Sequence, residues 1–169
     1  QQKALPFLYL IYTLCSFIER IHLPLYRHLL TLPRKSAIIS TEKMCKMPKQ
    51  ERRIFDKDVQ VWVHRYENLR NMAHWHFENE LVVCQEGAAE IMLDGIFYTL
   101  HQGDCAFFCG ERVHNIRGTV DSRIAVAQFG NLLHSPCYLK KPIFPDRYNA
   151  CERMNELNAE YQKKQLFYA

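Results

Sequence analysis

The segment that decides the fold runs from His74 to His114, and it opens with the run HWHFENE at residues 74–80. Side chains alternate between the two faces of an extended strand, so residues 74, 76 and 80 share a parity and can point to one side of a sheet. His114 follows on a later segment, after glycines at positions 103 and 110 that permit tight turns. The spacing therefore predicts a cage of three imidazoles and one carboxylate.

The same segment predicts a series of short antiparallel strands. Asp94-Gly95 separates two apolar-rich runs at residues 90–93 and 96–100, and this dipeptide suits a two-residue type I′ turn. Strand-like runs also occur at residues 59–63, 81–84, 88–93, 105–108, 114–116 and 123–129. Such spacing favours an antiparallel sandwich or barrel over a parallel α/β sheet.

Two stretches of the chain carry a resemblance to the cupin family. The run His74-Trp75-His76, then Glu80, then Gly87 resembles the first cupin motif, and Gly103-Asp104 followed by His114 resembles the second. The resemblance covers roughly residues 55–130. It implies a mainly all-β fold, in which a small antiparallel cupin-like β-barrel, or double-stranded β-helix, is followed by a C-terminal α-helix.

The chain departs from the cupin pattern at two turns. Asn68 stands where the first motif usually begins with glycine. Cys109-Gly110-Glu111 stands where the second motif usually carries a proline-glycine turn. The turn geometry is therefore the part of the resemblance that the structure has to test.

The surroundings of the first motif are similar to the amino-terminal sensing domain of AraC-type transcription regulators. Arg65-Tyr66 precedes the motif, and a polar helix follows the second one. The resemblance implies a domain that binds a small-molecule effector, with a sugar as the family-level expectation, and that forms a homodimer. DNA would be contacted only through a helix-turn-helix part, which is absent from this chain and which we expect to follow residue 169.

The cage has two interpretations. Imidazole nitrogens and a carboxylate oxygen suit a divalent transition ion such as Zn, Fe, Mn or Ni, with His74, His76, Glu80 and His114 as metal ligands. In the alternative, His74 and His76 contact an organic ligand while Glu80 fixes the tautomer of one ring.

A small-molecule ligand needs flat apolar faces and a few polar contacts. We expect Trp62 and Tyr66 to supply the faces, and Arg65 and His76 to supply the polar contacts. Two functions follow: a sensor with no catalytic residues, or a metal-dependent cupin enzyme such as a dioxygenase or isomerase.

The sequence divides into four parts. Residues 1–47 form an extension that is basic and apolar, residues 48–135 the barrel, residues 136–145 a loop with prolines, and residues 146–169 a helix. Residues 1–53 carry ten Lys or Arg against three Asp or Glu, so the excess of positive charge in the chain, +4 in all, lies in its N-terminal part. Because Met44 and Met47 are the first internal methionines, we hypothesise that residues 1–43 lie outside the fold.

The terminal helix carries one apolar stripe. Ala150, Met154, Leu157 and Tyr161 recur at spacings of four, three and four, and Asp146 is a candidate N-cap. The stripe either packs on its own barrel or pairs with a second copy, and the AraC-type resemblance favours dimerisation through Met154, Leu157 and Tyr161.

Composition indicates one domain of ordinary size, with 48% hydrophobic and 24% charged residues. The seven cysteines are odd in number and form no Cys-x-x-Cys pair, which predicts reduced thiols, in part as small apolar fillers, and a cytoplasmic location. The apolar run at residues 4–18 is shorter than the roughly 20 residues of a membrane span, so no membrane partner is expected.

Overall fold

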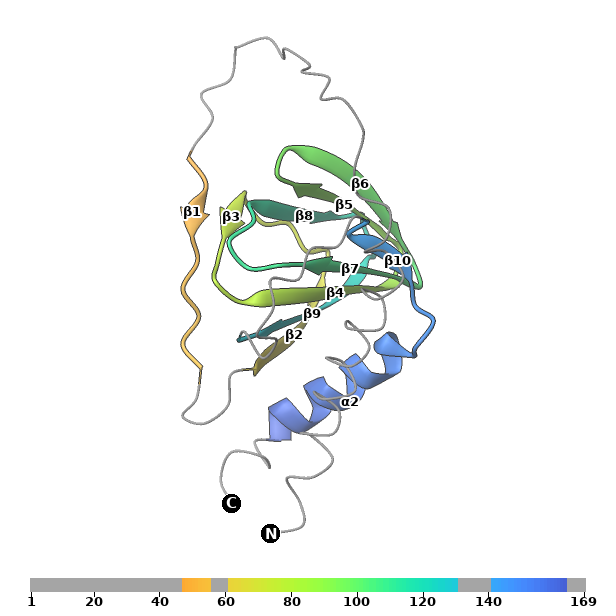
Figure 1. Cartoon of the computed structure of the whole chain (residues 1–169). Coiled ribbons are helices and arrows are strands. Elements are labelled where there is room, and N and C mark those ends of the chain that lie inside the picture. The colour runs from red at the N-terminus through yellow and green to blue at the C-terminus, as the bar shows by residue number, and fades with distance from the viewer. Residues whose placement is uncertain (1–46, 56–60, 131–140, 164–169) are drawn as a thin grey trace, which may run out of the picture.

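The computed structural model describes residues 47–55, 61–130 and 141–163 (Figure 1). Expectations for residues 1–46, among them the upstream extension, lie outside the described residues. The residues that remain include every predicted ligand of the cage and most of the terminal helix. Among them, no helix is both long and apolar enough to cross a bilayer.

Two five-stranded sheets form the body of the molecule. The first has the order β1 (Lys49–Gln50), β3 (His74–Trp75), β8 (His114–Gly118), β5 (Ala88–Leu93) and β6 (Ile96–His101). The second has the order β10 (Ile143–Pro145), β7 (Asp104–Phe108), β4 (Asn79–Glu86), β9 (Arg123–Phe129) and β2 (Val61–Glu67). All pairs between these strands are antiparallel except that of β1 with β3.

The strand pattern of the sequence is confirmed in most places. Strands β5 and β9 have the predicted bounds, and the others begin or end within a few residues of them. At the β5–β6 turn, Asp94 has φ of 49° and Gly95 has φ of 82°, the two positive values that a type I′ turn requires. The predicted fold class is therefore confirmed: a mainly antiparallel β structure of two sheets followed by an α-helix.

Two cores share the second sheet, because successive side chains on its strands point to opposite faces. Val82 and Cys84 of β4 pack between the sheets, together with Ile91 and Ile116 of the first sheet. Alternate residues of the second sheet point the other way and pack under the terminal helix, as Leu81 does. The space between the two sheets is thus the interior of the barrel.

The terminal helix, α2 (Ala150–Lys163), packs on the outer face of the second sheet (Figure 1). The Asp146 carboxylate accepts hydrogen bonds from the backbone N–H groups of Ala150 and Cys151, at 2.7 and 2.8 Å. Asp146 therefore caps the first turn as predicted, although the helix itself begins four residues later than the sequence suggested.

The buried stripe of α2 belongs to the chain's own core. Met154 and Leu157 are fully buried against the second sheet, and Tyr161 is partly buried there. Side chains covered by their own sheet cannot line a contact with a second copy. The expectation that Met154 and Leu157 make direct dimer contacts is corrected accordingly, while dimerisation itself stays a prediction.

Two further expectations about loops were wrong. The segment at residues 136–145 was expected to be a loop, but its last three residues form β10, whose Pro145 stands opposite Asp104. An edge strand tolerates proline because the missing N–H can face away from its neighbour. No strand was expected before residue 59, but β1 pairs with β3 at residues 49 and 50.

Candidate metal centre

The four predicted cage residues meet between the two sheets. His74 on β3 stands directly opposite His114 on β8, and Glu80 lies on β4 in the facing sheet. His76 sits in the short link that carries the chain from one sheet to the other. Residues 74, 76 and 80 therefore converge as predicted, but not because they share a face of one strand. They converge because the chain bends between β3 and β4.

One nitrogen of each imidazole is held by the backbone. Nδ1 of His74 donates to the carbonyl of Met72 at 2.8 Å, and Nδ1 of His114 donates to that of Arg112 at 2.8 Å. Nδ1 of His76 donates to the carbonyl of Glu78 at 2.9 Å. A carbonyl can only accept, so each Nδ1 carries a hydrogen, and in the neutral form of each ring the lone pair is on Nε2.

The histidines present these lone pairs to one another. One ring nitrogen from each of His74, His76 and His114 lies within 4.8 Å of the other two. The rings of His74 and His114 have centroids 4.4 Å apart, and those of His76 and His114 have centroids 4.9 Å apart. Nε2 of His114 is buried with no hydrogen-bond partner. Buried polar atoms are rarely left unpaired, so an unpaired imidazole nitrogen beside two further imidazoles fits a metal ion.

Glu80 places a buried charge beside the histidines. Its Oε2 accepts hydrogen bonds from Nε2 of Gln128 at 2.8 Å and lies 3.0 Å from Nε2 of His76. Its Oε1 lies 3.7 Å from Nε2 of His114. Burial alone would raise the pKa of the carboxyl, but the protonated forms of His114 and His76 outweigh it and hold the pKa far below its usual range. Glu80 is therefore a carboxylate.

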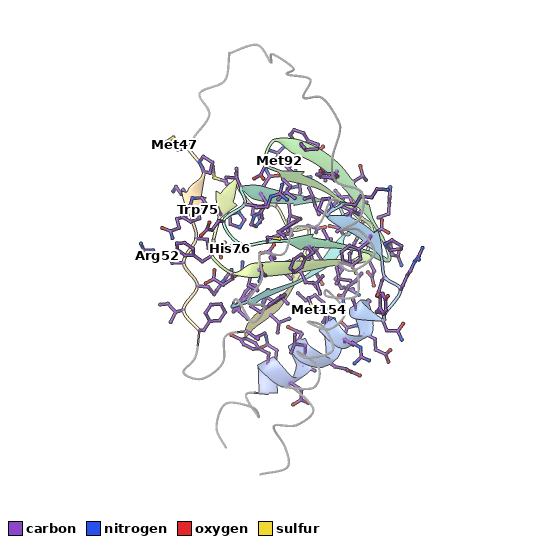
Figure 2. The ribbon with its side chains drawn as sticks, viewed as in Figure 1. Met47, Arg52, Trp75, His76, Met92 and Met154 are labelled. Carbon is purple, nitrogen blue, oxygen red and sulfur yellow. The ribbon has the colours of Figure 1, made fainter. Side chains whose placement is uncertain are left out.

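A second carboxylate reaches the centre from residues 47–55, which we call the strap. Exposure alternates from residue 51 onward, so that Glu51 and Arg53 face the barrel while Arg52 and Ile54 face solvent. Figure 2 shows Arg52 pointing away from the barrel. Glu51 Oε2 lies 3.1 Å from Nε2 of His74. The other Glu51 oxygen is paired with the guanidinium of Arg53.

Arg53 joins the strap to the second sheet. Its Nε donates to Oε1 of Gln128 at 2.9 Å, and its guanidinium carbon lies 3.7 Å from the centre of the Trp62 ring. Contacts thus run without a break from His74 through Glu51, Arg53 and Gln128 to Glu80. Sequence reasoning missed Glu51, Arg53 and Gln128, and the signal available was only the inward parity of residues 51 and 53.

The ion pair between the strap and β3 shifts the pKa of both partners. The hydrogen bond from His74, with the positive charge of Arg53, lowers the pKa of Glu51 although partial burial opposes the shift. Burial pulls the pKa of His74 down, but the hydrogen bonds to Glu51 and to the Met72 carbonyl raise it overall. Each group therefore favours the charged form of the other.

The four residues expected to bind a small molecule do not share one face. Trp62 and Tyr66 point from β2 to the barrel side, partly buried, and their rings form a row with that of His64. Arg65 has the opposite parity and is exposed, so its expected role as a polar contact is wrong. Arg53 instead supplies a guanidinium beside Trp62.

Both departures from the cupin turns are accommodated. Asn68 has φ of 54°, a left-handed conformation in which asparagine is the usual substitute for glycine. Glu111 also has a positive φ, of 67°. At Gly110, a Cβ atom would lie 2.1 Å from the carbonyl oxygen of Phe77, so only glycine permits this close approach.

No protein-family model matches the chain, and no curated protein matches it. Among solved structures, an RmlC-like cupin from Shewanella frigidimarina shows 15% identity and a TM-score of 0.38, with 41% of this chain and 66% of that chain covered. A variant of oxalate decarboxylase from Bacillus subtilis shows 13% identity and a TM-score of 0.39, with 49% and 25% covered. KdgF from a Halomonas species shows 17% identity and a TM-score of 0.38, with 41% and 69% covered.

The matched part of this chain spans less than two thirds of the Shewanella cupin and only a quarter of the decarboxylase. Similarity of this extent assigns no function, because one fold hosts many chemistries. The function has to be argued from the side chains of the centre.

Proposed function

We propose that this chain is a metal-binding, cupin-like domain in which His74, His76 and His114 hold one divalent transition ion. A single observation carries the proposal: backbone carbonyls fix the hydrogen of all three rings on Nδ1, and the three Nε2 atoms face one another in a buried space. Zn, Fe, Mn and Ni are the ions that suit imidazole nitrogen combined with carboxylate oxygen. Glu80 is the first carboxylate available to such an ion.

The ion, when bound, would act as a Lewis acid toward an oxygen atom of a small molecule. The chain's own residues prepare the surroundings. Glu80 supplies negative charge that offsets the cation, and Gln128 fixes one of its oxygens. The strap covers one side, since Glu51 contacts His74 and Arg53 contacts Trp62. Trp62 and Tyr66 add flat apolar surface near the guanidinium of Arg53.

We further propose that the small molecule is an effector and that the domain is a sensor of the AraC type, which acts as a homodimer. Two observations support a sensor. The sequence around the first motif resembles such domains, and the strap contacts His74 and Gln128, so a ligand bound beside these two residues would compete with the strap. Occupancy would therefore change the position of a segment on the surface, which a partner can detect.

A metal-dependent enzyme is the second candidate, and Glu80 favours it. A buried carboxylate that lies 3.0 Å from Nε2 of His76 and 3.7 Å from Nε2 of His114 can complete the coordination of the ion and orient a molecule bound there. The sensor needs no such group, whereas an isomerase or a dioxygenase uses one.

Metal binding is tested by elemental analysis of the purified chain, followed by titration of the metal-free protein with Zn²⁺, Mn²⁺, Ni²⁺ and Fe²⁺ in a calorimeter. We expect one ion per chain. His114→Ala should weaken binding by roughly 100-fold or more, since even groups that merely orient a ligand are worth about 10–100-fold. His101→Ala is the matched control, because His101 is exposed on β6 away from the centre, and it should bind as the wild type does. Absence of binding by the wild type would exclude the proposal.

A sensor and a metal-dependent enzyme can be distinguished by incubating the metal-loaded chain with sugars and small organic acids. A sensor should raise its melting temperature with one compound and return that compound unchanged, because a ligand of the native state stabilises it by mass action. An enzyme should convert the compound, which NMR of the mixture would record. Conversion that ceases in Glu80→Gln with metal still bound would favour the enzyme.

A further inference from the structure

Glu51 lies where a ligand of the metal would lie, although it belongs to neither motif. Its Oε2 is 3.1 Å from Nε2 of His74, the nitrogen that His74 offers to the centre. Ligand atoms bound to one ion at about 2.0–2.2 Å stand roughly 3.0–3.4 Å apart when they occupy adjacent positions. The separation of Glu51 and His74 falls in this interval. That of Glu80 Oε2 from His76 Nε2, at 3.0 Å, does so as well.

The backbone brings Glu51 to this position. Strand β1 runs parallel to β3, with Lys49 opposite His74 and Gln50 opposite Trp75. The N–H of Glu51 then donates to the carbonyl of Trp75 at 2.9 Å, which continues the pairing by one residue. The height of Glu51 along the wall of the barrel is thus set by the same strand that carries His74.

The side chain of Glu51 is oriented by Arg53. The guanidinium holds one carboxylate oxygen, while its own position is fixed by Gln128 and by the face of Trp62. The remaining oxygen is directed at the histidines. A carboxylate with one oxygen anchored and the other aimed at a metal site matches the pattern in which neighbouring groups orient a ligand.

We propose that Glu51 is a further ligand of the metal, so that the ion binds the strap to the barrel. The inference rests on the proposed function, because it requires that the three histidines hold an ion. Two carboxylates balance the charge of a divalent cation. Three imidazoles and two carboxylates also exceed the four ligands usual for a structural zinc site, so Mn²⁺, Fe²⁺ and Ni²⁺ fit this set better than Zn²⁺ does.

The test compares Glu51→Gln with a control that changes the same charge nearby. Glu78 is suited to this, since its carboxylate lies 3.7 Å from His76 Nδ1, and Glu78→Gln keeps the backbone carbonyl that holds the His76 ring. In the full chain, we expect Glu51→Gln to weaken Mn²⁺ binding by roughly 100-fold and Glu78→Gln to change it no more than a few-fold. Neither described core contains Glu51 or Glu78, so both variants should fold.

A spectroscopic measurement separates a ligand from a positioning residue. The visible absorption of bound Co²⁺ depends on how many atoms coordinate it, and the band intensity rises when the coordination number falls. We expect the spectrum of saturated Glu51→Gln to differ from that of the wild type, and the spectrum of Glu78→Gln to match it. Hydrogen exchange should show metal-dependent protection of residues 47–55 in the wild type and in Glu78→Gln, but not in Glu51→Gln.

The results of these experiments support or overturn the assignment of Glu51 as a metal ligand. Unchanged affinity in Glu51→Gln, or weakened affinity with the wild-type cobalt spectrum, would overturn the assignment of Glu51 as a ligand, while the loss of binding in His114→Ala would leave the histidine centre standing. If the wild type binds no metal, the proposed function fails and this inference fails with it.

Discussion

Glu80 shows how far a protein environment can control one ionisable group. The side chain is 2% exposed, yet it is charged, because His76, His114 and Gln128 surround its two oxygens. A buried carboxylate without such partners would take up a proton. The three partners therefore stabilise the ionised form of Glu80 in the folded chain, and the free energy of unfolding should depend on the ionisation of this residue.

The pH dependence follows from the direction of the shift. The pKa of Glu80 is lower in the folded chain than the 4.5 of an exposed glutamate, so folding favours the ionised form. The resulting stability is fully present above pH 4.5 and is lost as the pH falls below that value toward the folded pKa. Urea unfolding of the metal-free chain between roughly pH 3 and pH 7 should show this loss, and Glu80→Gln should show a smaller one.

Glu90→Gln serves as the control for that experiment, because Glu90 is exposed on β5. Its acid dependence should match that of the wild type. An acid loss in Glu80→Gln as steep as in the wild type would place the responsible group elsewhere.

At the same scale, local pattern predicted the ligands and missed their partners. His74, His76, Glu80 and His114 could be found because each stands in one of two stretches that resemble cupin motifs. Glu51 and Gln128 could not, because their approach depends on which strands become neighbours. Arg65 could have been excluded from the sequence alone, since its parity differs from that of Trp62 and Tyr66.

At the scale of elements, the turn between β7 and β8 places His114 close to His76. Glu111 N–H donates to the carbonyl of His76 at 2.6 Å, and Gly110 N–H donates to Oδ1 of Asn79 at 3.2 Å. The turn that precedes His114 is thus bonded to the link that carries His76. Its geometry should control the metal site as well as the stability of the barrel.

Gly110→Ala tests that coupling. The new Cβ would lie 2.1 Å from the carbonyl oxygen of Phe77, so the turn has to move away from the His76 link. We expect a loss of about 2–3 kcal/mol in the free energy of unfolding and a clear weakening of metal binding. Thermal unfolding and calorimetric titration would measure the two effects.

Gly103→Ala provides the comparison for this variant. Gly103 has φ of 83° with open space around it, so alanine there meets backbone strain of about 1–2 kcal/mol but no clash. Metal affinity should remain at the wild-type value. Equal metal affinity in both variants would show that the turn does not position the histidines.

Elements with a strong local signal were predictable, and those defined by distant partners were not. The Asp94-Gly95 turn and strands β5 and β9 follow from residue type and alternation. Strand β10 was missed because Pro142 and Pro145 indicate a loop, and β1 because two residues are too few for a pattern. The apolar stripe of α2 predicted the helix but could not tell which surface covers it, and the structure places its own sheet there.

At the scale of the whole molecule, the centre joins three parts of the chain. His74 and His114 belong to the first sheet, Glu80 belongs to the second, and Glu51 belongs to the strap. An ion bound by these residues would hold both sheets and the strap to one point. Its binding energy would then add to the stability of the entire barrel.

Two shortened chains test this view together with the hypothesis that residues 1–43 lie outside the fold. A chain that begins at Met47 contains both described cores and the whole centre, so it should unfold at the temperature of the full chain and bind metal equally well. A chain that begins at Ile54 lacks Glu51 and Arg53. It should fold, yet bind metal roughly 100-fold more weakly.

The two shortened chains would be compared by thermal unfolding and by titration with Mn²⁺. If the chain that begins at Met47 fails to fold, residues before it contribute to the barrel and the hypothesis is wrong. Metal affinity that survives in the chain that begins at Ile54 would show that the strap takes no part in the centre.

The parallel pairing of β1 has a consequence for how copies of this protein behave in solution. A bare sheet edge offers unsatisfied amide and carbonyl groups on which another polypeptide can add itself as an extra strand. β1 shields that margin of β3. If Glu51 binds the ion, β1 is held on β3. Removal of the ion by a chelator should release β1 and expose the edge of β3, so copies of the metal-free protein should associate with one another.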